Sequence, residues 1–135
     1  MKTFAIWFAA TLTLFGFLSG AYHAYLSENP RRVLVVIDSS FPMRAVWRKA
    51  EAELRSLNGR RYTEYALISE KARIHSWSEA LRLGTLSPFA PRNFANLRNS
   101  ARYPEMNSAM EVHFITNAAE TQTSEFSEWI VHRLR

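Results

Sequence analysis

The sequence predicts an α/β protein, a small three-layer sandwich with a mostly parallel sheet plus a hairpin, preceded by one transmembrane helix. Three observations predict it. An uncharged apolar run opens the chain, an unbroken aliphatic strand follows at residues 33–37, and segments of helical and strand periodicity come after it. We therefore divide the chain into a transmembrane signal-anchor helix at 1–27, a linker at 28–32 and an α/β domain at 33–135.

The N-terminal run has the length and composition of a membrane-spanning helix. No residue from 3 to 27 carries a formal charge, and Phe4 to Leu26 supplies 23 mostly apolar residues. A helix needs about 20 such residues to cross the hydrocarbon core of a bilayer. Tyr22 and Tyr25 would lie at the level of the lipid headgroups. We expect the run to stay in the chain as a single-pass anchor.

The same run also has the features of a cleavable signal peptide. Lys2 is a short basic start, residues 4–18 form the apolar centre, and Ser19-Gly20-Ala21 has the pattern of a cleavage site. Positive charge hardly differs between the two flanks, with Lys2 facing Arg31 and Arg32, so it sets no orientation. The signal-like start favours the bacterial inner membrane, with the C-terminal domain on the periplasmic side.

The first elements after the linker are a strand and an amphipathic helix. Val33 to Ile37 are all β-branched or aliphatic, which is typical of a central parallel strand that is buried on both faces. From Met43 to Leu57 apolar residues recur at helical spacing, and Asn58-Gly59 ends the segment. Pro42 fits the first turn of this helix, and the preceding Ser39-Ser40 pair can cap it.

A hairpin and a short helix are expected next. Residues 61–69 and 71–77 have the composition of two strands joined tightly around Glu70-Lys71. Ser76 and Glu79 have the spacing of a capping box, which predicts a short helix that ends at Gly84.

The last third of the chain predicts two more helices and a strand. A weak helix at 91–102 would turn Phe94, Leu97 and Ala101 inward, and residues 110–116 form an apolar strand. A final helix begins at Ser124. Its apolar face consists of Phe126, Trp129, Ile130 and Leu134. The predicted order is β-α-β-β-α-(α)-β-α.

Polar residues follow the first and last predicted strands. In open α/β sheets, ligands bind beside the carboxyl ends of the strands, so residues that follow different strands can meet there. The residues concerned are Asp38, Ser39, Ser40 and Asn117.

The strand ending in Asp-x-Ser, the long helix, the hairpin and a later strand ending Ile-Thr-Asn resemble a von Willebrand factor type A domain. The resemblance covers Val33 to about Arg135 and implies a truncated version of that domain. In the family, Asp-x-Ser-x-Ser, a loop Thr and a strand-end Asp bind Mg²⁺. Asp38 and Ser40 occupy the first two matching positions, and Asn117 stands where the later Asp belongs.

This chain departs from the family motif at several positions. Pro42 replaces the second Ser, Ala118 replaces the Gly that follows the later Asp, and Thr85 is the residue that could stand for the loop Thr. Because Mg²⁺ prefers six oxygen ligands and usually carboxylates, these changes weaken the implied site. The alternative is structural: Asp38 caps the following helix, and Asn117 ends a strand.

Composition excludes several classes of function. The chain has no cysteine, which removes disulfides, thiolate metal sites and cysteine nucleophiles. Its net charge of +5 is spread among acidic residues without a nucleic-acid motif, so we expect no nucleic-acid partner. His75, His113 and His132 show no metal-ligand spacing, and no catalytic motif is visible. The sequence therefore predicts a protein that is not an enzyme and has no small-molecule substrate.

The leading hypothesis is an accessory or assembly subunit of a membrane protein complex, with membrane lipid and other integral membrane subunits as partners. Gly16 and Gly20 give the helix a small-residue face for packing. Leu86, Pro88 and Phe89 lie outside any periodic element and could form an exposed contact surface. The alternative from another class is a Mg²⁺-dependent ligand-binding module.

Overall fold

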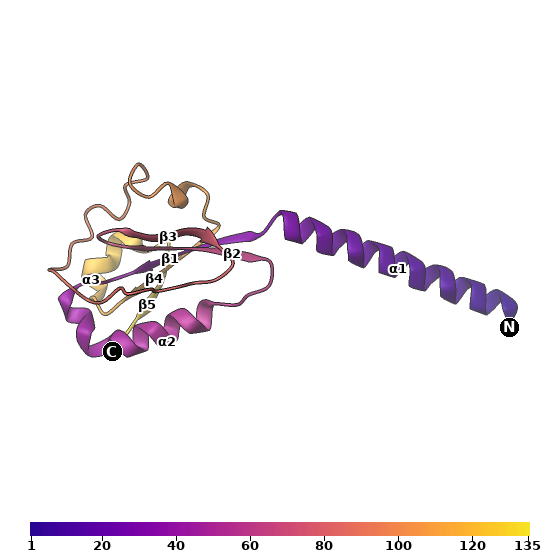
Figure 1. Ribbon diagram of the computed structural model, residues 1–135, viewed down its shortest axis with the longest axis horizontal. Coiled ribbons are helices and arrows are strands. Elements are labelled where there is room, and N and C mark those ends of the chain that lie inside the picture. Colours follow the sequence, from indigo (N-terminus) through magenta and orange to yellow (C-terminus); the bar gives the residue numbers. More distant parts are fainter. The chain divides into compact units, whose positions relative to one another are not determined.

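The computed structural model describes residues 1–135. It contains two compact units, residues 1–30 and residues 31–135. The first holds helix α1 (Lys2–Glu28) and the second holds the α/β domain (Figure 1). The elements of the domain are β1 (Arg31–Ile37), η1 (Phe41–Val46), α2 (Trp47–Leu57), β2 (Thr63–Ser69), β3 (Arg73–Ser78), η2 (Pro104–Asn107), β4 (Glu111–Thr116), α3 (Glu120–Thr123), η3 (Ser124–Phe126) and β5 (Ile130–Arg133).

Helix α1 confirms the long apolar helix expected at the N-terminus. It runs for 27 residues, buries none of them within the chain, and is long and apolar enough to cross a membrane. The hydroxyl groups of its two central threonines donate hydrogen bonds to backbone carbonyl oxygens of the same helix. Thr11 Oγ1 lies 2.8 Å from the carbonyl oxygen of Trp7, and Thr13 Oγ1 lies 2.9 Å from that of Ala9. These bonds suit an apolar solvent, in which an unpaired hydroxyl is costly.

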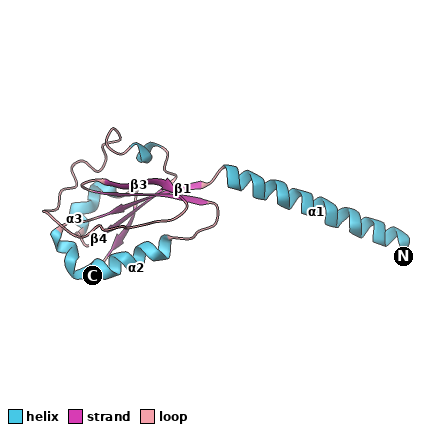
Figure 2. Ribbon diagram, in the orientation of Figure 1, coloured by secondary structure: helices cyan, strands magenta, loops and turns pink.

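The domain is built on a five-stranded sheet with the order β3-β2-β1-β4-β5 (Figure 2). Strand β1 pairs in parallel with β2 and β4, and β4 pairs in parallel with β5. Only β2 and β3 are antiparallel, and they form the expected hairpin. The mostly parallel α/β fold predicted from the sequence is therefore confirmed.

The central strand is buried on both faces, as its aliphatic run predicts. Alternate side chains of β1 point to opposite faces. Val33, Val35 and Ile37 pack with Leu54 of α2, and Leu34 and Val36 pack on the other face. Helix α2 covers the first of these faces (Figure 1). The second core is completed by Ala66, Ile68, Leu97, Tyr103, Phe114 and Phe126.

The C-terminal segment is not the helix that was predicted. After the short turns of α3 and η3, the chain enters β5 and pairs with β4, with Ile130 opposite His113. Ile130 and Val131 are β-branched and fit a strand better than a helix. Trp129 packs on Phe126 with ring centroids 4.6 Å apart, so the aromatic residues fill the core without a helical face.

The two weaker helices are also absent. Strand β3 continues through Ser76 to Ser78, so the predicted capping box does not form. Between residues 91 and 102 the chain makes turns, because the Asn93 and Asn99 side chains accept backbone N–H groups two residues further on, which competes with helix formation. Phe94 and Leu97 still pack into the core as expected, whereas Ala101 is exposed.

The helix after β1 begins differently from the prediction. A 3-10 segment, η1, carries Pro42 in its first turn, and the α-helix starts only at Trp47. Ser40 occupies the N-cap position of η1 but makes no side-chain cap bond. The hydroxyl of Ser40 instead donates to Asp38, and the hydroxyl of Ser39 donates to Glu70, both at the carboxyl end of the sheet. Strands β2 and β4 lie on opposite sides of β1, so the chain changes direction across the sheet between them. In α/β proteins, ligands bind beside the carboxyl ends of the strands at such a switch point.

Candidate functional site at the carboxyl ends of the parallel strands

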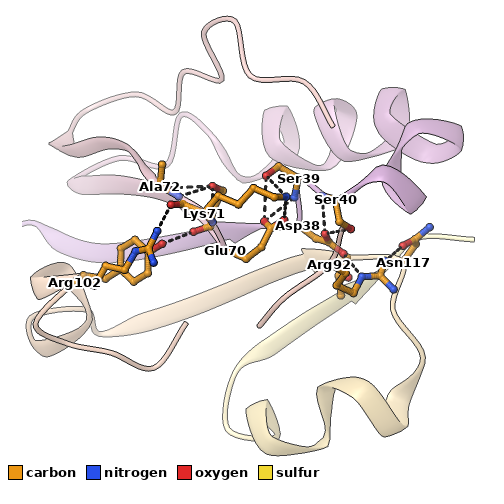
Figure 3. Close-up of polar contacts among 12 residues, drawn as sticks. Asp38, Ser39, Ser40, Glu70, Lys71, Ala72, Arg92, Arg102 and Asn117 are labelled. Carbon is orange, nitrogen blue, oxygen red and sulfur yellow. Dashed lines mark hydrogen bonds and ion pairs between the residues drawn. The ribbon is translucent and has the colours of Figure 1, made fainter. Parts of the chain in front are cut away.

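Asp38 lies at the centre of the carboxyl edge of the sheet, directly after β1 (Figure 3). Its side chain is fully buried. One oxygen, Oδ1, accepts the backbone N–H of Ser40 at 3.0 Å and the hydroxyl of the same serine. The other, Oδ2, accepts the hydroxyl of Thr116 at 2.7 Å. These bonds come from the loop after β1 and from the end of β4, so Asp38 joins the two strands.

The charge of Asp38 is balanced by Arg92, which comes from the long loop between β3 and β4. Arg92 Nε donates to Asp38 Oδ2 at 3.0 Å. The Nη2 group donates to Asn117 Oδ1, and Nη1 lies 3.2 Å from Gln122 Oε1. Only 17% of the Arg92 side chain is exposed. The guanidinium therefore bridges the ends of β1 and β4 from within the protein (Figure 3).

A second buried carboxylate, Glu70, follows β2 at the same edge. Its Oε2 accepts the backbone N–H of Ser39 at 2.8 Å and the hydroxyl of Ser39 at 3.1 Å. Lys71 forms an ion pair with Oε1. The edge therefore holds two fully buried carboxylate side chains, each paired with one cation of the same chain.

The loop that carries Arg92 is fastened to the loop after β1 by the backbone. Phe89 N donates to the carbonyl oxygen of Ser39 at 2.8 Å, and Phe41 N donates to that of Ala90 at 3.0 Å. Ala90 has a φ of 61°, a conformation that costs a residue with a side chain some free energy. The two bonds hold Arg92 over Asp38.

Two phenylalanine side chains remain exposed on this edge, Phe41 at 48% and Phe89 at 47%. A cation lies over each ring, with the guanidinium carbon of Arg44 at 4.9 Å from the Phe41 centroid and Lys71 Nζ at 4.7 Å from the Phe89 centroid. We call Phe41 and Phe89 the aromatic pair. It offers apolar surface beside positive charge, which is the composition of many contact surfaces.

The structure brings the predicted metal residues together. Asp38, Ser40 and Asn117 meet at the carboxyl edge, but they meet around Arg92. The threonine that reaches Asp38 is Thr116. Thr85, the residue expected to stand for the family's loop threonine, lies instead in a concavity lined by residues of β3 and the following loop.

The donor set can be tested against Mg²⁺, which needs six oxygens in octahedral geometry. Both oxygens of Asp38 are engaged, by Ser40, Thr116 and Arg92, and the amide oxygen of Asn117 also accepts from Arg92. In this arrangement the residues fit a guanidinium group and not a magnesium ion. Magnesium could bind here only if the Arg92 side chain moved away from Asp38 and Asn117. The magnesium site therefore remains a prediction.

The residues predicted to contact a partner differ in how exposed they are. Phe89 is exposed, Leu86 is half-buried against the core, and Pro88 is buried. A side chain added at Gly16 or Gly20 would meet nothing within 4 Å in this chain. Of the loop residues, Phe89 therefore offers the most surface to a partner.

A hollow of about 570 Å³ lies elsewhere, beside β3, and is lined in part by His75, Ser78, Glu79 and Arg82. Both ring nitrogens of His75 are engaged there, Nδ1 with the carbonyl oxygen of Ser76 at 2.8 Å and Nε2 with the N–H of Arg82 at 3.2 Å. His75 therefore has no nitrogen free to act as a base without losing a bond.

Sequence reasoning missed Glu70, Lys71 and Arg92. The first two follow a buried strand, so the rule that selected Asp38 would have selected them if residues 61–69 had been recognised as parallel to the first strand. Arg92 lies in a loop of irregular structure, and nothing in its local sequence indicates its role. No protein-family model, curated protein or solved structure matches this chain.

Proposed function

We propose that this protein is a non-enzymatic accessory or assembly subunit of a membrane protein complex. Helix α1 anchors it, and the α/β domain contacts another subunit outside the bilayer. The observation that carries the proposal is the surface of α1, whose 27 residues bury nothing within the chain and are apolar enough to cross a membrane. Such a surface is stable only against lipid or other helices.

The small residues of α1 support packing against another helix. Gly16 and Gly20 are four residues apart and therefore share one face. Because no atom of this chain approaches either position, nothing within the chain requires glycine there. Small residues at this spacing let two helix backbones approach closely in a membrane. We infer that this face meets a helix of another subunit.

The carboxyl edge of the domain supports binding to protein rather than catalysis. Asp38 and Glu70 are both paired with cations of the chain, and neither side chain is exposed. What the edge presents outward is the aromatic pair. We propose that Phe41 and Phe89 form the centre of the contact with a partner subunit.

The finer placement of the protein is also a proposal. The signal-like start favours the bacterial inner membrane and a periplasmic domain. A degenerate von Willebrand factor type A-like domain is supported by the sequence of β1, α2, the β2–β3 hairpin and β4, with Asp38 and Asn117 at one edge. The alternative proposal is a Mg²⁺-dependent ligand-binding module, which is supported by the proximity of Asp38, Ser40 and Asn117.

Affinity purification of the full chain from membranes in a mild detergent tests the leading proposal. We expect at least one integral membrane protein to co-purify at a constant ratio. The double substitution Gly16→Ile and Gly20→Ile should remove it, whereas Ala21→Ile, which lies on a different side of the helix, should not. A protein that always emerges alone would contradict the proposal.

The domain contact is tested separately with Phe41→Ser and Phe89→Ser in the same purification. Both side chains are about half exposed, so their loss should leave the fold intact. We expect the co-purifying partner to dissociate at lower salt or detergent concentration than with the unsubstituted protein. Ile130→Ser, at a site with 47% exposure on the edge strand β5, serves as the matched control.

A further inference from the structure

Two histidines that the sequence places 19 positions apart lie side by side in the sheet. His113 of β4 and His132 of β5 have ring centroids 5.1 Å apart, and His113 Nδ1 lies 2.8 Å from His132 Nε2. The other nitrogen of each ring meets a carboxylate. His132 Nδ1 lies 2.7 Å from Glu53 Oε1 of α2, and His113 Nε2 bonds to Glu111 Oε1. The four side chains form one continuous hydrogen-bonded chain from α2 to the start of β4.

One number of ring hydrogens satisfies every contact of the pair. A carboxylate only accepts hydrogen bonds, so the nitrogens that face Glu53 and Glu111 must carry hydrogens. A hydrogen bond of 2.8 Å between the rings needs one more hydrogen, shared between them. Three hydrogens on the four nitrogens satisfy all of these contacts, and the pair then carries one positive charge. With only two hydrogens on the pair, the lone pairs of His113 Nδ1 and His132 Nε2 would face each other. With four hydrogens, two N–H groups would face each other at the same place.

Charged groups from each neighbouring element surround the pair. Arg60, in the loop before β2, donates to Glu111 Oε1 at 3.2 Å, and Arg31 of β1 pairs with Glu111 Oε2. On the other side, Lys49 of α2 donates to the backbone oxygen of Arg135 at the C-terminus. A second positive charge on the rings would be repelled by Arg60 and Arg31 as well as by the first.

Burial acts in the same direction as this repulsion. Only 4% of the His113 side chain is exposed. Burial lowers the pKa of His113 below its ordinary value, although the bond to Glu111 opposes the shift, and the neighbouring His132 and Arg60 lower it further. For Glu111, burial acts to raise the pKa, but the bonds from His113 and Arg60 outweigh it and lower the value. The folded domain thus favours the pair with one shared proton over the pair with two.

We propose that His113 and His132 form a proton-binding site that fastens β5 to β4 and α2 while one proton is shared, and releases β5 when acidification adds a second. β5 is the element this site controls, because it has four residues, lies at the sheet edge and pairs only with β4. The detached strand binds the second proton as an ordinary histidine does, near pH 6.5, whereas the docked strand resists it. Below about pH 6.5 the detached strand therefore holds more protons than the docked pair, and falling pH favours detachment there.

Histidine-selective NMR on the full chain in detergent micelles tests this inference. With ¹⁵N-labelled histidine, we expect three ring hydrogens on the pair where β5 is most protected and a fourth where its protection is lost. Amide exchange is measured in the same samples. Protection of His132 and Leu134, whose N–H groups face β4, should fall below about pH 6.5, by up to about tenfold for each pH unit, since one proton is taken up.

Three variants separate the proton site from a merely structural contact. The double variant His113→Gln with His132→Gln keeps two polar groups but leaves no ring to titrate, so protection of β5 should no longer depend on pH between 7.5 and 5. Glu53→Gln leaves both rings but removes the carboxylate that stabilises the docked, charged pair, and should move the loss of protection to higher pH. His75→Gln, whose ring contacts no carboxylate, should leave the curve unchanged.

Several results would overturn the proposal. Two hydrogens on the pair at the pH where β5 is most protected would contradict the shared proton. Protection of β5 that stays constant down to pH 5 in the unsubstituted protein would show that the site does not control the strand. If the double variant His113→Gln with His132→Gln fails to fold, an unchanged pH curve in Glu53→Gln would be enough to reject the mechanism.

Discussion

Removing Arg92 is the substitution whose effect the structure specifies best. Arg92→Met leaves Asp38 as a fully buried carboxylate without a counter-charge. Removing one partner of a buried ion pair costs about 3–5 kcal/mol. Asp38 keeps three other donors, the N–H and hydroxyl of Ser40 and the hydroxyl of Thr116. We therefore expect a loss at the low end, about 3 kcal/mol in the free energy of unfolding.

A double-mutant cycle separates the charge from the packing. Asp38→Asn with Arg92→Met removes both charges and keeps the side-chain volumes similar, so the double variant should lose only about 1 kcal/mol, the value of the lost hydrogen bonds. The coupling between the two sites should then be at least about 2 kcal/mol. Arg44→Met, an exposed cation that lies over Phe41, is the matched control and should change stability by less than about 0.5 kcal/mol.

The assay is urea unfolding of the full chain in mild detergent micelles, followed by near-ultraviolet circular dichroism of the aromatic core. All variants are compared at one pH and one salt concentration. A loss below about 0.5 kcal/mol for Arg92→Met, or a coupling near zero, would refute the argument that Arg92 neutralises Asp38 within the folded domain.

Two further substitutions test the core and its pH dependence. Phe126→Ala empties a site with 1% exposure between Phe114 and Trp129 and should cost about 3–4 kcal/mol in the same urea assay, whereas Phe89→Ala should cost less than about 1 kcal/mol. Burial raises the pKa of Tyr103 above its usual 10.0, so the unfolded chain loses this proton first and stability should fall as the pH rises above about 10. Tyr103→Phe should remove that loss, and a variant with the same alkaline slope as the unsubstituted protein would contradict the assignment.

Periodicity correctly predicted the elements in which a regularly spaced set of apolar residues is buried. The aliphatic run at 33–37 became the central strand, and the apolar residues spaced along 43–57 became the inner face of η1 and α2. The hairpin followed from two short strands around Glu70-Lys71. In each case burial of a regular face decides the structure, and the sequence shows that face directly.

The errors occurred where contacts distant in sequence decide the structure. Residues 124–134 carry apolar side chains at helical spacing, but Ile130 and Val131 complete the sheet beside β4, and Phe126 fills the core from a 3-10 turn. Tertiary packing outweighed local propensity there. The segment at 91–102 was decided by side-chain bonds of Asn93 and Asn99 to nearby N–H groups.

The candidate site was predicted in part. The rule that strand ends meet placed Asp38, Ser40 and Asn117 together, and the structure confirms that they converge. The expected donors for Asp38 were the first N–H groups of the next helix, but only the N–H of Ser40 contributes, beside two hydroxyls and Arg92. A long irregular loop delivers Arg92, and no local pattern in the sequence predicts such a contact.

The carboxyl edge of the sheet is closed by the protein's own cations, Arg92 and Lys71, and one titration tests this most directly. The thermal unfolding temperature of the full chain in detergent is measured in chelator and then with millimolar Mg²⁺ or Mn²⁺, for the unsubstituted protein and for Asp38→Ala. We predict no stabilisation by either metal, and an equal loss for Asp38→Ala with and without metal. A rise in unfolding temperature with metal that Asp38→Ala abolishes would show that a metal displaces Arg92, and would contradict the account.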